Sequence, residues 1–231
     1  MSAKRIVVAI DGPAGAGKST IARRIASRMG FLYIDTGAMY RAVALWAQRA
    51  GVGLEDHLNL EQLARAAEIE LRSNPSGVLL NGEDITELIR NAEISQAASK
   101  ASAIPGVRRA LVEKQRAMGE VTSIVMEGRD IGTVVFPDAE VKIFLDAAPE
   151  IRAQRRLDEL KAKGPTDQTF DSVLKDITER DTRDRSRSEA PLMQAPDAEY
   201  VDSTRHSIEQ VEERILALVR ARFSNGKELK K

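Results

Sequence analysis

A short segment of the chain has the residue types and spacing needed to bind a nucleoside triphosphate. Glycines in the pattern GPAGAGKST let the backbone curl around a phosphate, so that its amides face the anion. Lys18 can reach the outer phosphates, and the hydroxyl of Ser19 can bind Mg²⁺. Because the apolar run Ile6–Ile10 precedes this segment and apolar residues at helical spacing follow it, we expect a strand, a loop and a helix. The predicted phosphate-binding loop consists of Gly12, Pro13, Ala14, Gly15, Ala16, Gly17, Lys18, Ser19 and Thr20.

Arginines form a second set of residues that could do chemistry. On a helix, Arg180, Asp184 and Arg187 would share one face, with Arg183 nearby. A solvated helix with alternating charge pairs is the other interpretation of this segment. Further isolated arginines are Arg41, Arg108 and Arg129. Guanidinium groups bind phosphate in a forked geometry and can neutralise the charge that develops during phosphoryl transfer, so this set favours phosphoryl-transfer chemistry.

Composition limits the class of protein. A chain of 231 residues suits one α/β domain with insertions, and 35 basic against 35 acidic side chains give no basic field for nucleic acid or membranes. The absence of cysteine excludes disulfides and thiolate metal sites. No apolar stretch approaches the roughly 20 residues that span a bilayer. We therefore expect a cytoplasmic protein with no nucleic-acid or membrane partner, and we expect His57 and His206 to be surface side chains.

Short apolar runs alternate with helical patterns along the chain. This alternation is typical of an α/β fold in which helices cover both faces of a parallel sheet. The predicted strands are Arg5–Asp11, Phe31–Ile34, Ser123–Met126, Val141–Leu145 and Tyr200–Asp202. Ligands bind at the carboxyl ends of such strands, and three of these ends carry polar residues: Asp11, Asp35 and the run Glu127–Asp130.

The two aspartates at strand ends allow two interpretations each. We favour Asp35 as the cap of the helix that follows, and a water-mediated contact with Mg²⁺ is the alternative. Asp11 could support the ligand-binding residues or accept hydrogen bonds from loop amides.

One region departs from the alternation. Apolar and polar residues alternate over Ile69–Arg72, and Val78–Leu80 is a short apolar run, with turn residues between the two. This pattern predicts a small antiparallel hairpin between helical stretches. Residues 224–231 carry one apolar side chain among glycine and charges, which predicts a flexible tail.

The absence of a guanine-reading Asn-Lys-x-Asp or Thr-Lys-x-Asp sequence argues against a switch GTPase. A mechanical ATPase would need a longer chain. A small-molecule kinase needs only a donor loop, an acceptor pocket and a closing lid. A regulator that binds ATP without transferring a phosphoryl group is the alternative from outside the enzymes.

Four blocks resemble the signature sequences of the bacterial cytidylate kinase family: Gly12–Thr20, Asp35–Arg41, Glu127–Pro137 and Glu179–Arg187. The resemblance runs from about Arg5 to Arg220. It implies phosphorylation of CMP and dCMP by a monomer that uses ATP with Mg²⁺; UMP, AMP and shikimate-like molecules are the alternative acceptors.

The resemblance also implies a fold, that of P-loop nucleoside monophosphate kinases. A five-stranded parallel sheet with helices on both faces would be joined by a small antiparallel sheet and a short lid. Residues 1–35 and 104–223 would form the core, with the lid at about 155–190. Residues 36–103 would form the monophosphate-binding region, with the insert at about 60–100.

By the same resemblance, Thr36, Arg41 and Arg129 contact the acceptor phosphate. Ser99, Arg108 and Asp130 would face the cytosine, Arg180 and Asp184 the ribose, and Arg187 would be a lid arginine. The catalytic set would be Lys18, Arg129, Arg180 and Arg187. Cytosine presents an amino donor beside two acceptors, whereas uracil places a carbonyl where the amino group was, so a carboxylate beside this edge would reject uracil. No general base is needed, because the acceptor phosphate is already anionic.

Overall fold

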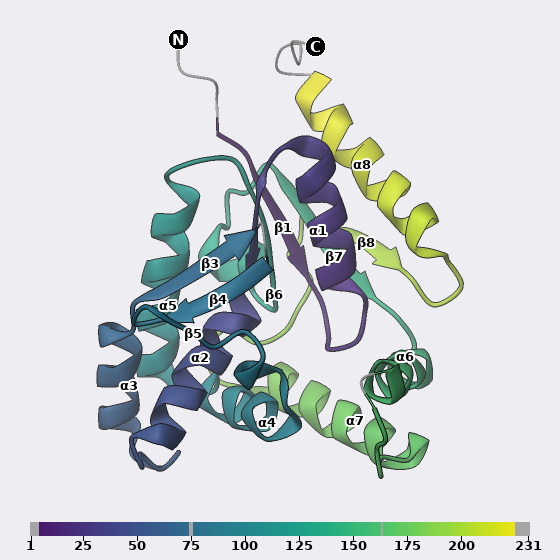
Figure 1. Ribbon diagram of the computed structural model, residues 1–231. Helices are drawn as coiled ribbons and strands as arrows, with labels where there is room; N and C mark the ends of the chain where they lie inside the picture. Colours follow the sequence, from purple (N-terminus) through teal and green to yellow (C-terminus); the bar gives the residue numbers. More distant parts are fainter. Residues whose placement is uncertain (1–4, 74–75, 163, 225–231) are drawn as a thin grey trace.

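A five-stranded parallel sheet forms the centre of the computed structural model, which describes residues 5–73, 76–162 and 164–224 (Figure 1). The strand order is β2-β6-β1-β7-β8. The strands are β1 (Val7–Asp11), β2 (Leu32–Asp35), β6 (Ile124–Gly128), β7 (Val141–Asp146) and β8 (Glu199–Asp202). The five strands predicted from apolar runs are confirmed, with ends that differ by two residues or fewer.

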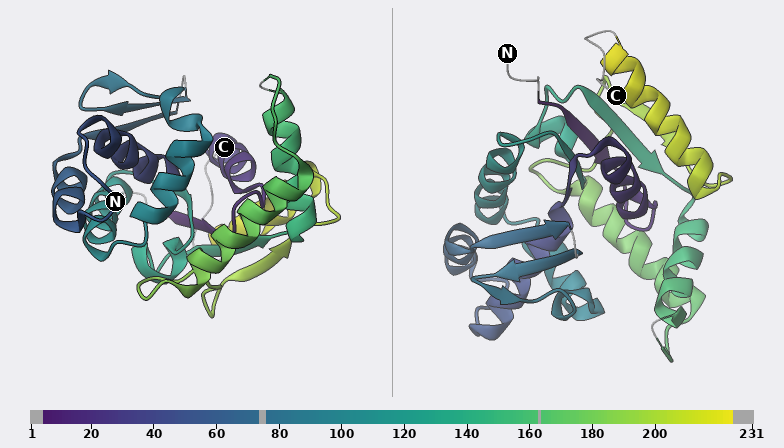
Figure 2. Two further views of the ribbon diagram at one scale, coloured as in Figure 1. Left: turned by 90° about the horizontal axis from the view of Figure 1, so that it is seen from below. Right: turned by 45° about the horizontal axis from the view of Figure 1, so that its top comes forward.

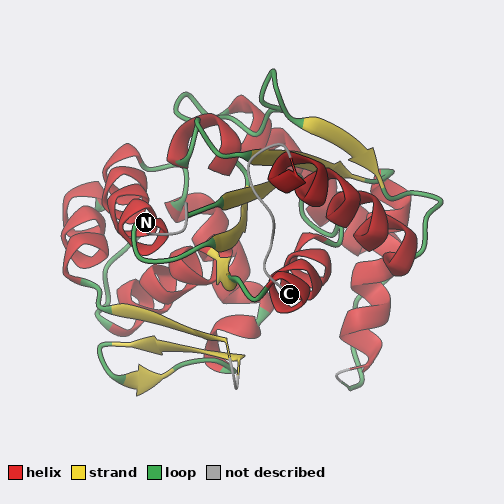
Figure 3. Ribbon diagram, turned by 90° about the horizontal axis from the view of Figure 1, so that it is seen from above, coloured by secondary structure: helices red, strands yellow, loops and turns green. Residues whose placement is uncertain are grey.

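Helices cover both faces of this sheet because successive strand residues point to opposite sides. Val8 and Ile10 pack with α1 (Lys18–Met29) and α8 (Ile208–Ser224). Ala9 faces the other side and packs among residues of α5 (Pro105–Gly119) and a π-helical turn, η2 (Ile131–Val135). Figure 3 shows the strands from above with helices on either side. The predicted three-layer α/β architecture is therefore confirmed.

The segment between β2 and β6 builds a second hydrophobic cluster beside the sheet. It contains α2 (Thr36–Arg49), α3 (His57–Ala66), η1 (Leu88–Arg90) and α4 (Ala92–Ala101). A small antiparallel sheet in this segment has the order β3-β4-β5, formed by β3 (Ile69–Ser73), β4 (Ser76–Leu80) and β5 (Glu83–Asp84). The predicted hairpin is confirmed, and the two-residue strand β5 adds to it. Part of its turn, residues 74–75, lies outside the described residues, as does most of the predicted tail.

Two helices lie between β7 and β8, in the part of the chain for which a lid at about 155–190 is predicted. α6 (Pro149–Ala162) and α7 (Phe170–Ser186) pack through a small apolar cluster of their own. In the views of Figure 2, α7 extends between α4 and α6 near the ends of the sheet strands.

The prediction that Arg187 shares a helix with Arg180 is wrong, because α7 ends at Ser186 and the backbone of Arg187 is extended. The carbonyl of Asp184 accepts from the amide of Leu192 at 2.8 Å. The Asp184 carbonyl therefore does not make the hydrogen bond to the amide four residues later that would continue the helix. The Nε of Arg187 donates to the carbonyl of Ala190 at 2.6 Å, which holds the turned chain in place.

None of the described helices is long and apolar enough to cross a membrane.

Candidate active site

The phosphate-binding loop lies between β1 and α1, as predicted. Gly12 has φ +147°, and a Cβ on it would stand 1.9 Å from the carbonyl oxygen of Leu145, so only glycine fits there. Gly17, with φ +92°, is the residue before the first turn of α1. The loop therefore leads directly into a helix N-terminus, where backbone amides and the helix dipole favour an anion.

Lys18 is buried in the loop, and its Nζ donates to the carbonyl of Pro13 at 2.6 Å. Burial, followed by the charges of Arg129 and Arg180, lowers the pKa of Lys18 to about 7, although Glu127 and Asp11 act in the opposite direction. Cations crowded so closely disfavour one another's charge. A polyanion placed among them would relieve this repulsion.

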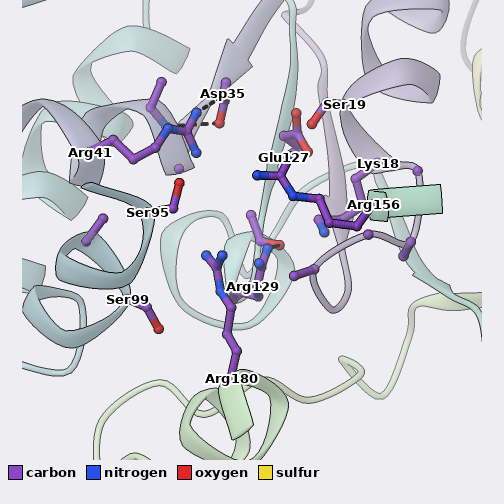
Figure 4. Close-up of a pocket in the computed structure, with 18 of the residues that line it drawn as sticks. Lys18, Ser19, Asp35, Arg41, Ser95, Ser99, Glu127, Arg129, Arg156 and Arg180 are labelled. Atoms are coloured by element: carbon purple, nitrogen blue, oxygen red, sulfur yellow. Dashed lines mark hydrogen bonds and ion pairs between the residues drawn. The ribbon is translucent and has the colours of Figure 1, made fainter. Parts of the chain in front are cut away.

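Arginines from three elements surround the same space. Figure 4 shows Arg129 and Arg180 lining the same space as Lys18, with Arg41 across from Lys18 beside Asp35. Burial and the charge of Arg129 lower the pKa of Arg180 to about 10, and the Nε of Arg180 has no hydrogen-bond partner among the described residues. The cleft has a volume of about 1270 Å³. That volume exceeds the roughly 300–1,000 Å³ typical of a pocket for one small ligand, so it suits two substrates.

Carboxylates hold two of these arginines in place. Arg41 pairs with Asp35 at 2.9 Å, and the Nε of Arg129 donates to Asp184 at 2.9 Å. Burial acts to raise the pKa of Asp184, but Arg129 and Arg180 outweigh it, so this pKa lies below its ordinary value. An ionised Asp184 therefore orients the arginines before any ligand is present.

A third ion pair also lines the cleft. Arg108 and Asp130 form a short, buried contact, and Arg108 also donates to the carbonyl of Ser102 at 3.1 Å. The Arg108 guanidinium stands over the ring of Tyr40, 5.9 Å from its centroid. Nη2 of Arg187 lies 3.8 Å from Asp130 without a hydrogen-bond partner among the described residues. This part of the cleft therefore presents a carboxylate acceptor flanked by donors.

Two further predicted residues have hydroxyl groups that are already bonded. The hydroxyl of Thr36 donates to the carbonyl of Glu127 at 2.7 Å. The hydroxyl of Ser99 accepts a hydrogen bond from Nη1 of Arg183 at 2.8 Å. Thr36 would have to release its partner to donate to a phosphate, whereas Ser99 keeps its proton free.

The structure shows which groups the two strand-end aspartates contact. Asp35 accepts from the amide of Ala38 at 3.0 Å, which confirms that it caps α2. Asp11 accepts from the amides of Ile131 and Gly132, both at 2.7 Å. Both amides belong to the turn η2 and not to the phosphate-binding loop. Asp11 instead fixes the segment that follows Arg129, and burial raises its pKa to about 6.

Glu127 is a site residue to which the sequence analysis gave no role. It is the last residue but one of strand β6, beside the strand that leads into the phosphate-binding loop, and it is buried. Burial and then Asp35 raise its pKa, while Lys18 and hydrogen bonds from Tyr33 and Ser19 lower it. Figure 4 shows it close to Ser19. An acidic residue at the end of the strand next to β1 was the signal that could have identified it.

Comparison with known proteins gives the family. The family model described as cytidylate kinase matches residues 8–221. The chain belongs to the cytidylate kinase family. It is 61% identical over 226 residues to a cytidylate kinase from Solibacter usitatus, covering 97% of each chain. It is 53% identical to one from Pelotomaculum thermopropionicum, covering 93% of this chain and 96% of that one.

Membership of the cytidylate kinase family agrees with how the predicted site residues gather. All of them line the one cleft except Gly12 and Pro13, which shape the loop behind it. His57 and His206 are exposed, as expected. The role of each lining residue stays a prediction.

Proposed function

We propose that this chain transfers the γ-phosphoryl group of ATP to CMP and dCMP, giving CDP or dCDP and ADP by direct in-line displacement. The observation that carries the proposal is that one cleft is lined by the phosphate-binding loop with Lys18, by Arg129 and Arg180, and by the Arg108–Asp130 pair. A donor held at one end and an acceptor at the other would bring their phosphates together among these cations. Family membership supports the same reaction.

Positioning and charge neutralisation carry the proposed chemistry. The acceptor phosphate is already a nucleophile, so no side chain has to remove a proton from it. Lys18 and the loop amides would hold the donor phosphates, while Arg41 and Arg129 would hold the acceptor phosphate. Arg180, whose charge interacts with those of Arg129 and Arg41, would neutralise charge in the transition state. Arg187 stays a predicted lid arginine.

The donor set also fits Mg²⁺. No group of three His, Asp or Glu side chains among the described residues could hold a metal ion by itself. Mg²⁺ takes oxygen ligands and keeps several waters, so it suits the Ser19 hydroxyl with ATP oxygens, and Asp35 and Glu127 would bind its waters. When bound, the ion would neutralise charge on the donor phosphates.

Recognition of the base is proposed to depend on Asp130. Its carboxylate would accept from the cytosine amino group, and Arg108 and Ser99 would donate to the ring acceptors. Since Arg183 already donates to Ser99, the serine proton is available for this purpose. Uracil would place a carbonyl against Asp130 and leave a buried charge unpaired.

An acceptor panel tests the proposal. ADP release would be measured with CMP, dCMP, UMP, AMP and shikimate at equal concentrations. We expect turnover with CMP and dCMP and poor turnover with UMP. Binding of ATP without turnover of any acceptor would instead support a regulator.

The remaining expectations stay proposals: a monomer, a cytoplasmic location, no nucleic-acid partner, and the division into core, monophosphate-binding region and lid.

A further inference from the structure

Arg152 is a buried arginine that the proposed reaction does not use. It lies in the first turn of α6 and is 2% exposed. Its three nitrogens donate in three directions: Nε to the carbonyl of Ala147 at 2.8 Å, Nη1 to the carbonyl of Ala14 at 3.1 Å and Nη2 to Asp181 at 2.7 Å. One side chain therefore joins the β7–α6 connection, the phosphate-binding loop and helix α7.

The contact with the phosphate-binding loop is close along the backbone as well. A Cβ on Gly15 would stand 3.1 Å from the Cβ of Arg152 and 3.2 Å from its carbonyl oxygen. The loop thus rests directly on α6. Packed backbone has little room to yield, so displacement of the loop by a ligand would also displace Arg152.

The contact with α7 reaches the residues that face the acceptor. Asp181 follows Arg180 directly and precedes Asp184 by about one helical turn, and Asp184 accepts from Arg129. The charge of Asp181 is also among the causes that raise the pKa of Arg129. The position of Asp181 therefore affects both arginines of the proposed transfer site.

We propose that Arg152 and Asp181 are positioning residues that couple the donor loop to α7, so that a bound donor sets Arg180 and Asp184 for the acceptor. The proposal rests on ATP and CMP as the two substrates. A buried ion pair is weak support for stability by itself, and its directional bonds are better suited to fixing geometry. The three donors of a lysine all sit on one nitrogen, so lysine could not reach the three separate acceptors that the guanidinium spans, which explains the need for arginine.

Ligand coupling tests the proposal. The Kd of CMP would be measured without and with a saturating non-hydrolysable ATP analogue, at a temperature where circular dichroism shows every variant folded. We expect the analogue to lower the Kd about 5-fold or more in the unchanged protein. In Arg152→Lys and Asp181→Asn the ratio of the Kd without the analogue to the Kd with it should approach one. The double variant should lose no more of this coupling than either single variant, because the two residues act as one unit.

The matched control is Lys175→Gln. It breaks an exposed pair with Glu179, 3.9 Å apart, on the same helix. We expect it to keep both the coupling ratio and the turnover rate. A wild-type ratio in both Arg152→Lys and Asp181→Asn, with only a lower melting temperature, would show that the pair is merely structural.

A second measurement needs no variant. The ATP analogue alone, without CMP, should slow hydrogen exchange of the amides around residues 180–184 in the unchanged protein. Unchanged exchange there, in protein that still phosphorylates CMP, overturns the coupling and leaves the proposed function intact. Absence of CMP turnover would instead overturn the proposed function.

Discussion

Replacing Lys18 by methionine should abolish turnover and at the same time stabilise the ligand-free protein. The loss of activity follows from losing the cation that reaches the donor phosphates. The gain in stability follows from burial and neighbouring charges, which lower the pKa of Lys18 from its ordinary value of 10.5 to about 7. Folding therefore places this lysine where its charged form is disfavoured.

The size of the effect follows from linkage. Each pKa unit corresponds to about 1.4 kcal/mol, so at and below pH 7 the charged Lys18 costs about 4 to 5 kcal/mol of folding free energy. Between pH 7 and 10.5 the unfolded chain binds the proton that the folded chain has lost, so wild-type stability rises with pH. Methionine also loses the hydrogen bond to Pro13, worth about 1 kcal/mol, and removes one of the cations that interact with Glu127.

We expect a net gain of about 2 kcal/mol at pH 7, which for a chain of this size raises the melting temperature by roughly 4–8 °C. Differential scanning calorimetry between pH 6 and 10 would measure it, with Lys175→Met as an exposed control. The gain should shrink as pH rises. A lower melting temperature for Lys18→Met, or a gain that does not depend on pH, would refute the reasoning.

Three further outcomes are expected. Binding of ATP should raise the pKa of Lys18 again, so that each site takes up about 0.9 proton at pH 8. Calorimetry in buffers of different ionisation enthalpy would measure this uptake, and no uptake would mean that Lys18 is already fully charged in the free protein. Asp130→Asn should lower kcat/KM for CMP about 10²-fold and narrow the preference over UMP, and an unchanged preference would remove Asp130 from base recognition. Arg187→Ala should lower kcat on the order of 10²-fold, whereas a rise only in the KM for CMP would place it with the base.

Local patterns were enough to predict the sheet and the loop. Buried parallel strands appear as short apolar runs, and the spacing of the glycines before Lys18 and Ser19 is typical of a phosphate-binding loop. The cap at Asp35 also needs only neighbouring residues, since its partner is the amide of Ala38. The family resemblance supplied the remaining candidate site residues, and the structure places them in one cleft.

Partners far apart in the sequence could not be predicted. Asp11 bonds amides about 120 residues away, and no local pattern shows which loop will lie beside it. The three bonds of Arg152 likewise depend on where α6 comes to lie against the loop and α7. The end of α7 was missed because the charge pattern continues through Arg187, whereas the contacts of Leu192 and Ala190 decide where the helix stops.

The arrangement of charges also explains how the cleft can distinguish a nucleotide from a nucleoside. Arg41 and Arg129 are each held by a carboxylate, so a ligand phosphate must take them from Asp35 and Asp184 or share them. Only an anion can offer an arginine a comparable partner, and the Nε of Arg180, 3.9 Å from Asp184, adds a donor that no described residue satisfies with a hydrogen bond. A nucleoside without phosphate would leave the repulsion between these cations unchanged. Binding of the acceptor therefore depends on exchange of charged partners as well as on contacts to the base.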